Sequence, residues 1–292
     1  MTHSFAGAGV ALITPFNEDK SIDYNALERL VEDQILGGMD YLVVLGTTGE
    51  TPTLSEDEKK EVVRFVIEKN AGRLKIVVGM GGNNTLGLVQ SIKKANFAGV
   101  DAILSVTPWY SKPNQEGLFQ HFKMIVEVSP VPVILYNVPG RTGVNMDADT
   151  TLRIASLSEK VVAIKEAAGD LGQFAKIINN APAYFKVISG DDGLTLPSIS
   201  IGSIGVISVI ANALPDKLSQ LTHASLEGSM TLASQLHLQM SEMLKLIFRE
   251  GSPGGVKALM EMMGKAKNQL RLPLVPVSTS TWSAIEAEWK KF

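Results

Sequence analysis

Cysteine is absent from the 292 residues of this chain. The absence excludes disulfide bonds, cysteine-ligated zinc sites and thiol catalysis. Long apolar runs are also missing, because none reaches the roughly eighteen residues that a membrane-spanning helix needs. The N-terminal residues lack the basic start and the apolar stretch of a secretory leader. We therefore expect a cytoplasmic protein without a membrane partner.

Charge of one sign is not concentrated in any segment. The chain has 27 Lys and Arg against 30 Asp and Glu, a net charge of −3. Because the basic residues are spread along the chain, the sequence argues against a nucleic-acid partner. The spacing of the histidines does not suit metal ligands, so we predict no catalytic metal. The four histidines are His3, His121, His223 and His237.

Eight short apolar segments alternate with stretches of helical patterning. The segments are apolar throughout, which is typical of parallel strands buried on both faces. No Pro-, Gly- or Ser-rich linker interrupts the units, so we expect an α/β fold of the (β/α)8 TIM-barrel type. A doubly wound sheet is the weaker alternative, because its Gly-x-Gly-x-x-Gly turn is missing. The expected strands are 9–13, 41–45, 75–79, 102–105, 133–136, 161–165, 185–189 and 205–208.

Helix signals are clearest near Ser55 and in the last quarter of the chain. Ser55 with Glu58 has the pattern of a capping box, which predicts a helix over 55–70. After the eighth unit, apolar residues again recur at helical spacing, and Ser252 with Pro253 suits the N-cap and first residue of another helix. The expected organisation is a catalytic barrel over 1–228 and a C-terminal helical layer over 229–292, used for packing or assembly.

Lys165 is the leading candidate for catalysis. Catalytic groups of such barrels lie at the carboxyl ends of the strands, and Lys165 ends the sixth segment. Strand alternation places Val161, Ala163 and Lys165 on the side that faces the barrel interior. Burial favours the neutral amine, which is the nucleophile that forms a Schiff base. On position alone, Lys165 has an alternative role as a strand-end lysine that reaches solvent or pairs with Glu166.

Other strand ends carry polar residues of a compatible kind. Tyr136 ends the fifth segment, where a phenol suits proton transfer or a packed position at the rim. Arg141 follows on a loop constrained by Gly and Pro, and suits either a carboxylate or a surface salt bridge. The Gly-Thr-Thr-Gly-Glu sequence at 46–50 offers backbone N–H groups and two hydroxyls to a small anion. We interpret 79–82 as a tight turn rather than a P-loop, and 190–193 as a turn or cap.

Three motifs in this order and spacing resemble the dihydrodipicolinate synthase family of pyruvate-dependent class I aldolases. They are Gly-Thr-Thr-Gly-Glu at 46–50, Tyr-Asn-Val-Pro-Gly-Arg-Thr-Gly at 136–143 and Ile-Lys-Glu at 164–166. The resemblance spans essentially the whole chain. It implies that Lys165 forms an imine with pyruvate. It also implies a proton relay of Thr47, Tyr136 and Tyr110, in which Tyr110 reaches across from a partner subunit.

The same resemblance implies the substrate contacts and the reaction. Thr47 and Thr48 would hold the carboxylate of pyruvate, and Arg141 that of L-aspartate 4-semialdehyde. Gly190 and Ile207 would line the pocket through their backbones. The implied reaction joins the two substrates on the route to diaminopimelate and lysine, in a homotetramer built as a dimer of dimers. No cofactor is implied, because the protonated imine is itself the electron sink.

Two alternatives to this reaction remain open at the level of sequence. A related 2-keto acid aldolase, such as an N-acetylneuraminate lyase or a keto-deoxy sugar-acid aldolase, shares the scaffold. A non-catalytic ligand-binding barrel is the other, although Lys165 and Tyr136 argue against it. Arg141 favours an electrophile with a short acidic tail over a sugar chain.

Feedback inhibition by lysine is expected to be weak or absent. In lysine-sensitive members of the family, two histidines, an asparagine, a glutamate and a tyrosine line an interface cleft. Here the histidine positions fall on Glu56 and Lys59, and the asparagine on Asn83. The glutamate position falls on Gly87 and the tyrosine on Trp109. The change to Gly87 removes an anchor for the cationic end of the inhibitor.

Overall fold

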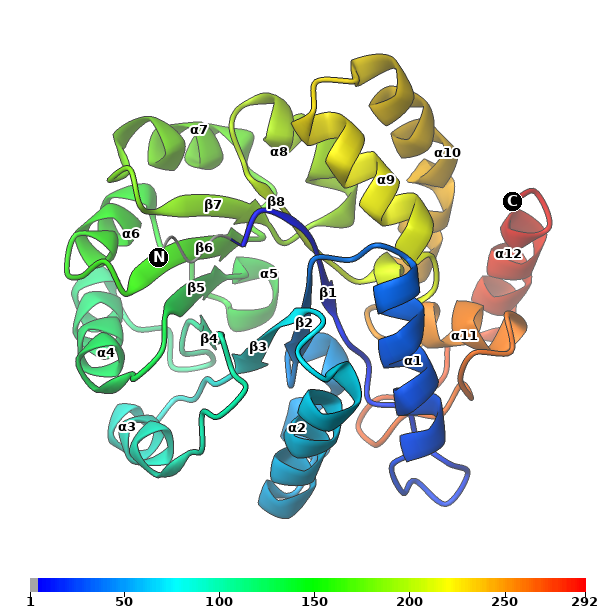
Figure 1. The fold of residues 1–292 in the computed structure, drawn as a ribbon, viewed down its shortest axis with the longest axis horizontal. Helices are drawn as coiled ribbons and strands as arrows, with labels where there is room; N and C mark the ends of the chain where they lie inside the picture. The colour runs from blue at the N-terminus through cyan, green and yellow to red at the C-terminus, as the bar shows by residue number, and fades with distance from the viewer. Residues whose placement is uncertain (1–4) are drawn as a thin grey trace.

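The computed structural model describes residues 5–292, so His3 lies outside the described residues. In this range eight parallel strands close into a barrel in sequence order, and β8 pairs with β1 (Figure 1). The expected (β/α)8 barrel is thereby confirmed. The strands are β1 (Gly7–Ala11), β2 (Tyr41–Val44), β3 (Lys75–Gly79), β4 (Ala102–Val106), β5 (Val133–Asn137), β6 (Val161–Glu166), β7 (Lys186–Ser189) and β8 (Gly205–Ser208).

The expected strand limits are correct for β3 and β8 and differ by one residue at one end for five others. The first strand was expected at 9–13 but lies two residues earlier. Leu12 and Ile13 are buried, which explains the error. The N–H of Ile13 donates to the side chain of Asn212 instead of a neighbouring strand. Apolar patterning cannot separate a strand from a buried segment that follows it.

Helices surround the strands. Longer helices cover the outside of the barrel, and short ones follow several strand ends. Ser55 caps α2 and forms the expected capping box with Glu58. The α-helices are α1 (Tyr24–Leu36), α2 (Glu56–Asn70), α3 (Thr85–Lys94), α4 (Gln115–Val128), α5 (Pro139–Thr142), α6 (Ala148–Ala155), α7 (Leu171–Asn180), α8 (Thr195–Ser200), α9 (Pro215–Leu226), α10 (Met230–Phe248), α11 (Gly254–Met262) and α12 (Thr279–Trp289). The 3-10 helices are η1 (Thr47–Gly49), η2 (Thr51–Thr53), η3 (Asp192–Leu194) and η4 (Ile210–Asn212).

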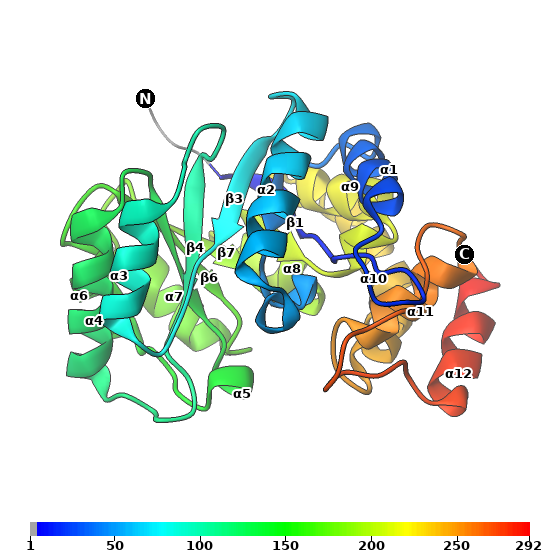
Figure 2. The ribbon, with the colours of Figure 1, turned by 90° about the horizontal axis from the view of Figure 1, so that it is seen from below.

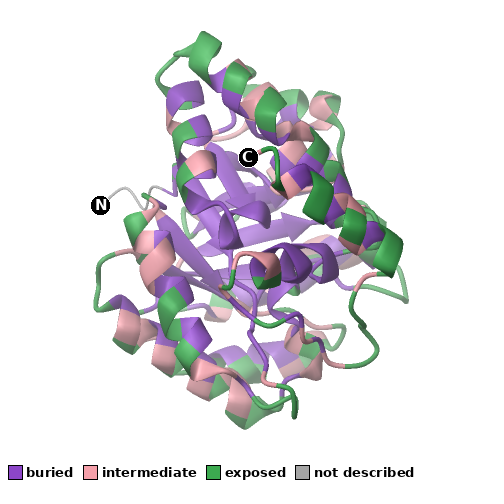
Figure 3. Cartoon of the chain, turned by 90° about the vertical axis from the view of Figure 1, so that its right-hand side faces the viewer, coloured by how far each residue is buried: buried purple, intermediate pink, exposed green. Residues whose placement is uncertain are grey.

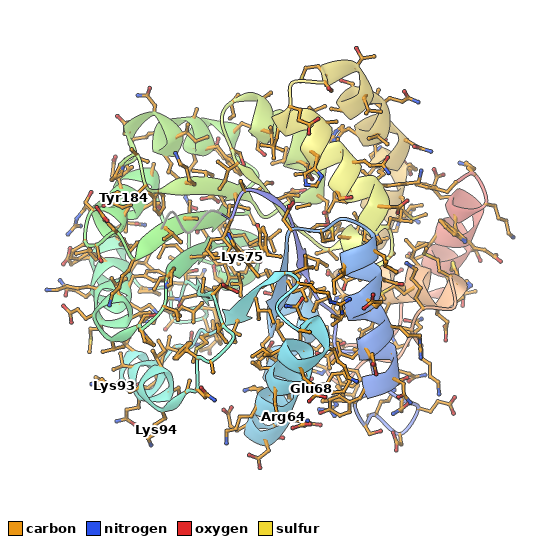
Figure 4. All side chains as sticks on the ribbon, in the orientation of Figure 1. Arg64, Glu68, Lys75, Lys93, Lys94 and Tyr184 are labelled. Carbon is orange, nitrogen blue, oxygen red and sulfur yellow. The ribbon has the colours of Figure 1, made fainter. Side chains whose placement is uncertain are left out.

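Burial follows this arrangement. The strands are buried, while the outer faces of the helices are exposed (Figure 3). Charged side chains cover those outer faces. On α2, for example, Arg64 Nη1 lies 2.7 Å from Glu68 Oε2, and Lys93 and Lys94 are exposed on α3 (Figure 4). The core therefore has an inner part within the barrel and an outer part between strands and helices.

The strand that carries Lys165 contains an irregularity that alternation did not predict. Val133 pairs with Val161, but the next residue of β5 pairs with Ala163, so Val162 is an extra residue in β6. Val161 consequently packs in the outer core, and Val162 packs with Ala163 inside the barrel. The expectation that Val161 shares the inner face with Ala163 and Lys165 was wrong. A bulge of this kind re-aims the residues that follow it.

The C-terminal helices lie on one side of the barrel, beyond α1 and α9 (Figures 1 and 2). Apolar residues of α10 and α11 share a core cluster with β1 and α9. The expected boundary at 228/229 falls in the turn between α9 and α10, and the division into two units stays a prediction. Pro253 was expected to be the first residue of a helix, but it is the N-cap of α11. Its carbonyl oxygen already accepts the N–H of Lys257 at 3.0 Å.

Two features are absent from residues 5–292. No helix in this part of the chain is long and apolar enough to cross a membrane. The same residues contain no group of three or more His, Asp or Glu side chains arranged to hold a metal ion. The segment 190–193 has the expected capping role, because Asp191 caps η3 by accepting the N–H of Gly193 at 2.8 Å.

Candidate active site

A cavity of about 510 Å³ lies at the carboxyl ends of the strands. Six of the eight residues proposed from sequence line it, from four different strand ends. They are Thr47, Thr48, Tyr136, Arg141, Lys165 and Gly190. Residues 46–50 follow β2, Tyr136 is on β5, Lys165 is on β6, and Gly190 follows β7. The barrel topology thus brings together residues that are up to 143 positions apart in sequence, from 47 to 190.

Lys165 is almost completely buried, with 4% of its surface exposed. It pairs in register with Tyr136 across the β5–β6 ladder. Its Nζ atom lies 4.5 Å from the centroid of the Tyr136 ring. Among the described residues, no carboxylate forms an ion pair with Lys165 within 4.0 Å. A buried primary amine over the ring of a neighbouring tyrosine can act as a nucleophile, with a group capable of proton transfer on the adjacent strand.

Glu166 does not pair with Lys165, although it is the next residue. Its carboxylate accepts hydrogen bonds from Asn137 Nδ2 at 3.0 and 3.1 Å and from Gln173 Nε2 at 2.8 Å. The N–H of Ala168 donates to it at 2.8 Å. Burial raises the pKa of Glu166, and these hydrogen bonds oppose that effect. The alternative role of Lys165, as the partner of Glu166, is therefore not what the structure shows.

Gly190 gives the Lys165 side chain its space. A Cβ atom at position 190 would lie 3.1 Å from both Cγ and Cε of Lys165, and 2.7 Å from Cβ of Ala167. The backbone N–H of Gly190 donates to the Glu166 carbonyl oxygen at 2.7 Å, so the two strand ends are held together. Any residue with a side chain at this position would displace the lysine.

The two threonines lie on the short 3-10 helix η1 directly after β2. This turn is the Gly-Thr-Thr-Gly-Glu motif itself, rather than a loop that precedes a longer helix. The first N–H groups of a helix have no partner within it, so the turn presents N–H groups together with two hydroxyls. Thr48 is buried and Thr47 is exposed, and both line the cavity. Such a turn can bind a small carboxylate.

Arg141 lies on a single helical turn, α5, and not on the irregular loop that was expected. Its Nη2 atom is 3.5 Å from the carbonyl oxygen of Ser252, a long contact to the C-terminal layer. Within the described chain it has no ion pair, so it is not the surface salt bridge that was the alternative. The guanidinium is thus available to a ligand with a carboxylate.

Tyr110 and Ile207 are not among the residues that line the cavity. Tyr110 is 90% exposed and has a φ of +66°, in a loop after β4. Ile207 is on β8, and its side chain is buried within the barrel. The structure therefore brings together six of the eight residues, and leaves Tyr110 on the surface of its own subunit.

Sequence reasoning missed the wall of the cavity that α10 provides. His237, Ser241 and Lys245 lie four residues apart and line the cavity, together with Leu244 and Phe248. Residues at this spacing share one helical face. Burial lowers the pKa of His237, and its buried Nδ1 atom has no hydrogen-bond partner in the described chain. The sequence did contain a signal for this wall, since polar residues recur every four positions beside the apolar residues of the same helix. Only the apolar residues were interpreted, and they were assigned to packing.

Comparisons with known proteins agree with this geometry. The model of the Dihydrodipicolinate synthetase family matches residues 4–291. A 4-hydroxy-tetrahydrodipicolinate synthase from Parabacteroides distasonis is 53% identical over 279 residues, which cover 96% of this chain and 94% of the relative. The structure of dihydrodipicolinate synthase from Aquifex aeolicus matches with a TM-score of 0.95 at 39% identity, over 98% of each chain.

A further solved structure carries one of the substrates expected from the sequence. It is the chloride-inhibited dihydrodipicolinate synthase from Acinetobacter baumannii complexed with pyruvate. It matches with a TM-score of 0.95 at 36% identity, over 98% of both chains. The sequence similarity, the barrel and the residues around Lys165 agree, and the chain belongs to the dihydrodipicolinate synthetase family.

Proposed function

We propose that this enzyme is a 4-hydroxy-tetrahydrodipicolinate synthase, which condenses pyruvate with L-aspartate 4-semialdehyde. The single observation that carries the proposal is the buried Lys165 amine, 4.5 Å from the Tyr136 ring, in a cavity at the strand ends. The family supports the same reaction, because relatives that are 53% and 51% identical to this chain are named 4-hydroxy-tetrahydrodipicolinate synthase.

The first half of the reaction activates pyruvate. The neutral Nζ of Lys165 attacks the keto carbon, and the carbinolamine takes up a proton and loses water to give an iminium ion. Removal of a proton from the methyl group then gives an enamine, with the iminium nitrogen as the electron sink. Tyr136 and Thr47 relay the protons in this proposal, and Thr47 and Thr48 hold the pyruvate carboxylate.

The second half joins the two substrates. The enamine carbon attacks the aldehyde carbon of L-aspartate 4-semialdehyde, and the aldehyde oxygen becomes the hydroxyl of the product. The amino group of the same substrate then attacks the iminium carbon, which closes the ring and releases Lys165. Neither half needs an external oxidant, reductant or cofactor.

Arg141 supports the choice of the second substrate. Its guanidinium lines the cavity beside Ser252 of the C-terminal layer, and we propose that it binds the carboxylate of the semialdehyde. Lys245 on α10 also lines the cavity, but its Nζ atom pairs with Glu242 Oε2 at 3.1 Å, and Asp191 adds a negative charge to the lining. The guanidinium of Arg141, which has no ion pair in the described chain, favours a short acidic electrophile over the polyhydroxyl chain that a sialic-acid lyase would bind.

Assembly is part of the proposal. Tyr110 is exposed on its own subunit and has a left-handed backbone conformation, which non-glycine residues adopt where other contacts hold them. We propose that it completes the proton relay of a partner subunit within a homotetramer. Tyr110→Phe should then lower the turnover rate, and a fully active enzyme that sediments as a monomer would contradict the assembly. The cytoplasmic location stays a prediction.

The experiment that tests the function compares electrophiles. Purified enzyme is given pyruvate with L-aspartate 4-semialdehyde, and in parallel is assayed for the cleavage of N-acetylneuraminate and of keto-deoxy sugar acids. We expect condensation with the semialdehyde to exceed the other activities by several orders of magnitude in kcat/KM. A higher kcat/KM for a sugar acid would identify a related aldolase. Inactivity with all of them would favour a ligand-binding barrel.

A further inference from the structure

A buried ion pair joins the C-terminal layer to the turn that carries Thr47 and Thr48. Lys257 lies on α11, and Glu50 directly follows η1. Both side chains are completely buried, and the distance between Lys257 Nζ and Glu50 Oε1 is 2.5 Å. The two residues are 207 positions apart in sequence, so the pair connects distant parts of the fold.

Both charged groups have further hydrogen bonds. Lys257 Nζ also donates to the carbonyl oxygens of Thr14 and Gln269, each at 2.8 Å, so all three ammonium protons have acceptors. Glu50 Oε2 accepts the backbone N–H of Arg271 at 3.0 Å. Burying two charges costs desolvation energy that an apolar pair of similar size would avoid. Stability alone therefore does not account for this pair.

Glu50 also determines the conformation of the turn. Its φ of +52° and ψ of +35° are left-handed, a conformation that residues other than glycine rarely adopt. Its N–H donates to the carbonyl oxygen of Thr47 at 3.2 Å. In the same turn, Thr14 Oγ1 donates to the carbonyl oxygen of Gly49 at 2.7 Å. The turn is thus bonded to the segment that follows β1 and, through Glu50, to α11.

The two sides of this turn have different surroundings. Thr47 and Thr48 line the cavity that contains Lys165, whereas Glu50 and Lys257 do not. Rotation of Glu50 out of the left-handed conformation would change the direction of the chain directly after the threonines. The ion pair opposes that rotation, because it would leave Lys257 buried without a counter-charge.

We propose that Glu50 and Lys257 are positioning residues, which hold the turn so that Thr47 and Thr48 face Lys165. The inference rests on the proposed function, in which the two threonines hold the pyruvate carboxylate. Neither Glu50 nor Lys257 touches the substrate. The C-terminal layer then takes part in catalysis, beyond the packing or assembly expected from sequence. Loss of the pair weakens pyruvate binding and leaves the Lys165 amine intact.

Two variants separate positioning from stability. Lys257→Met leaves the Glu50 carboxylate buried without a cation, which destabilises the fold strongly. The double variant Glu50→Gln/Lys257→Met removes both charges and should recover much of that stability. If the pair positions the turn, both variants should have a KM for pyruvate about 10- to 100-fold higher than the wild-type enzyme. An effect of this size is expected when binding groups are misplaced by about 1 Å. Recovered stability with an unrecovered KM is the result that supports positioning.

Glu58→Gln is the matched control. Glu58 accepts hydrogen bonds from Arg271 Nη2 at 2.6 Å and Nη1 at 2.8 Å, so it also ties α2 to the C-terminal segment. This ion pair lies outside the turn of residues 46–50, and its loss removes no hydrogen bond of Glu50, which contacts Arg271 only through the backbone N–H. The control variant should unfold at a lower temperature and retain the wild-type KM for pyruvate. A KM that rises as much as in the double variant would show that any loss of C-terminal contacts has the same effect.

The experiments distinguish failure of the proposed function from failure of the positioning role of Glu50 and Lys257. Wild-type enzyme is first reduced with borohydride in the presence of pyruvate, and absence of an adduct overturns the proposed function together with this inference. An adduct in the wild type, with a wild-type KM in the folded double variant, overturns this inference alone. If the double variant does not fold, Glu50→Gln is measured in the same way. A raised KM supports the role of Glu50, and an unchanged KM overturns it.

Discussion

Gly190 is a position at which one added methyl group should directly displace the side chain of Lys165. The new Cβ of Gly190→Ala would lie 3.1 Å from Cγ and Cε of Lys165 and 2.7 Å from Cβ of Ala167. Carbon atoms pack at about 3.5–4.0 Å, so the lysine must move by a few tenths of an ångström, and the contact with Ala167 requires a larger shift. Misplacement by about 1 Å can reduce the rate a hundredfold, so for this smaller shift we expect kcat/KM for pyruvate to fall about 10-fold.

The assay is steady-state kinetics with pyruvate as the varied substrate, together with the rate of borohydride trapping. Overpacking should also lower the stability by about 1–3 kcal/mol, which thermal unfolding measures. Gly82→Ala is the control, because it adds the same methyl group to another turn at the strand ends, where no atom lies within 4 Å. A Gly190→Ala enzyme that is trapped at the wild-type rate would refute the claim that this glycine makes room for the Lys165 side chain.

Four further predictions follow from the same geometry. Tyr136→Phe should fold normally but lower kcat by about 10²–10⁴-fold, the usual contribution of a general acid–base group, as steady-state kinetics will show. Arg141 is exposed, so Arg141→Ala should weaken use of the semialdehyde by about 1.5–3 kcal/mol, the scale of a hydrogen bond to a charged group, and leave imine formation with pyruvate unchanged; equal losses for both would indicate a structural role. His121 is buried, and burial lowers its pKa to about 4 from the ordinary 6.5. The unfolded chain therefore binds more protons between these values, so the stability present above pH 6.5 falls by about 3 kcal/mol as the pH approaches 4. A pH series of thermal unfolding should show this loss, and His121→Gln should reduce it. Free lysine should inhibit weakly for two reasons. The position of the glutamate that anchors the inhibitor in lysine-sensitive relatives is occupied by Gly87, and the Glu56 carboxylate already pairs with Lys59 at 2.7 Å. Strong submillimolar inhibition of the initial rate at saturating pyruvate would contradict this reading.

The strands and the part of the site formed by Lys165, Tyr136 and the two threonines were predictable, because the sequence patterns that mark them are local. Continuous apolar segments mark buried parallel strands, and each catalytic candidate follows or ends such a segment. The sequence alone therefore places Lys165, Tyr136 and the two threonines at the same end of the barrel. The burial and the proximity of Lys165 and Tyr136 agree with that placement.

The remaining features depend on contacts between distant residues. The extra residue Val162 in β6 leaves no mark in an apolar sequence, because either face accepts a valine. The wall formed by α10 requires the helix to fold back over the strand ends, which the spacing of His237, Ser241 and Lys245 does not specify. Likewise, nothing in the sequence near Glu50 or Lys257 distinguishes them from exposed charged residues, because only the fold brings the two side chains together and buries them.

The imine on Lys165 is the central claim, and one measurement tests it most directly. Enzyme incubated with pyruvate is reduced with borohydride and digested, and the peptides are weighed by mass spectrometry. The account predicts one stable pyruvate adduct, on the peptide that contains Lys165, and its loss together with nearly all activity in Lys165→Ala. An adduct on another lysine, or a fully active Lys165→Ala enzyme, would contradict it.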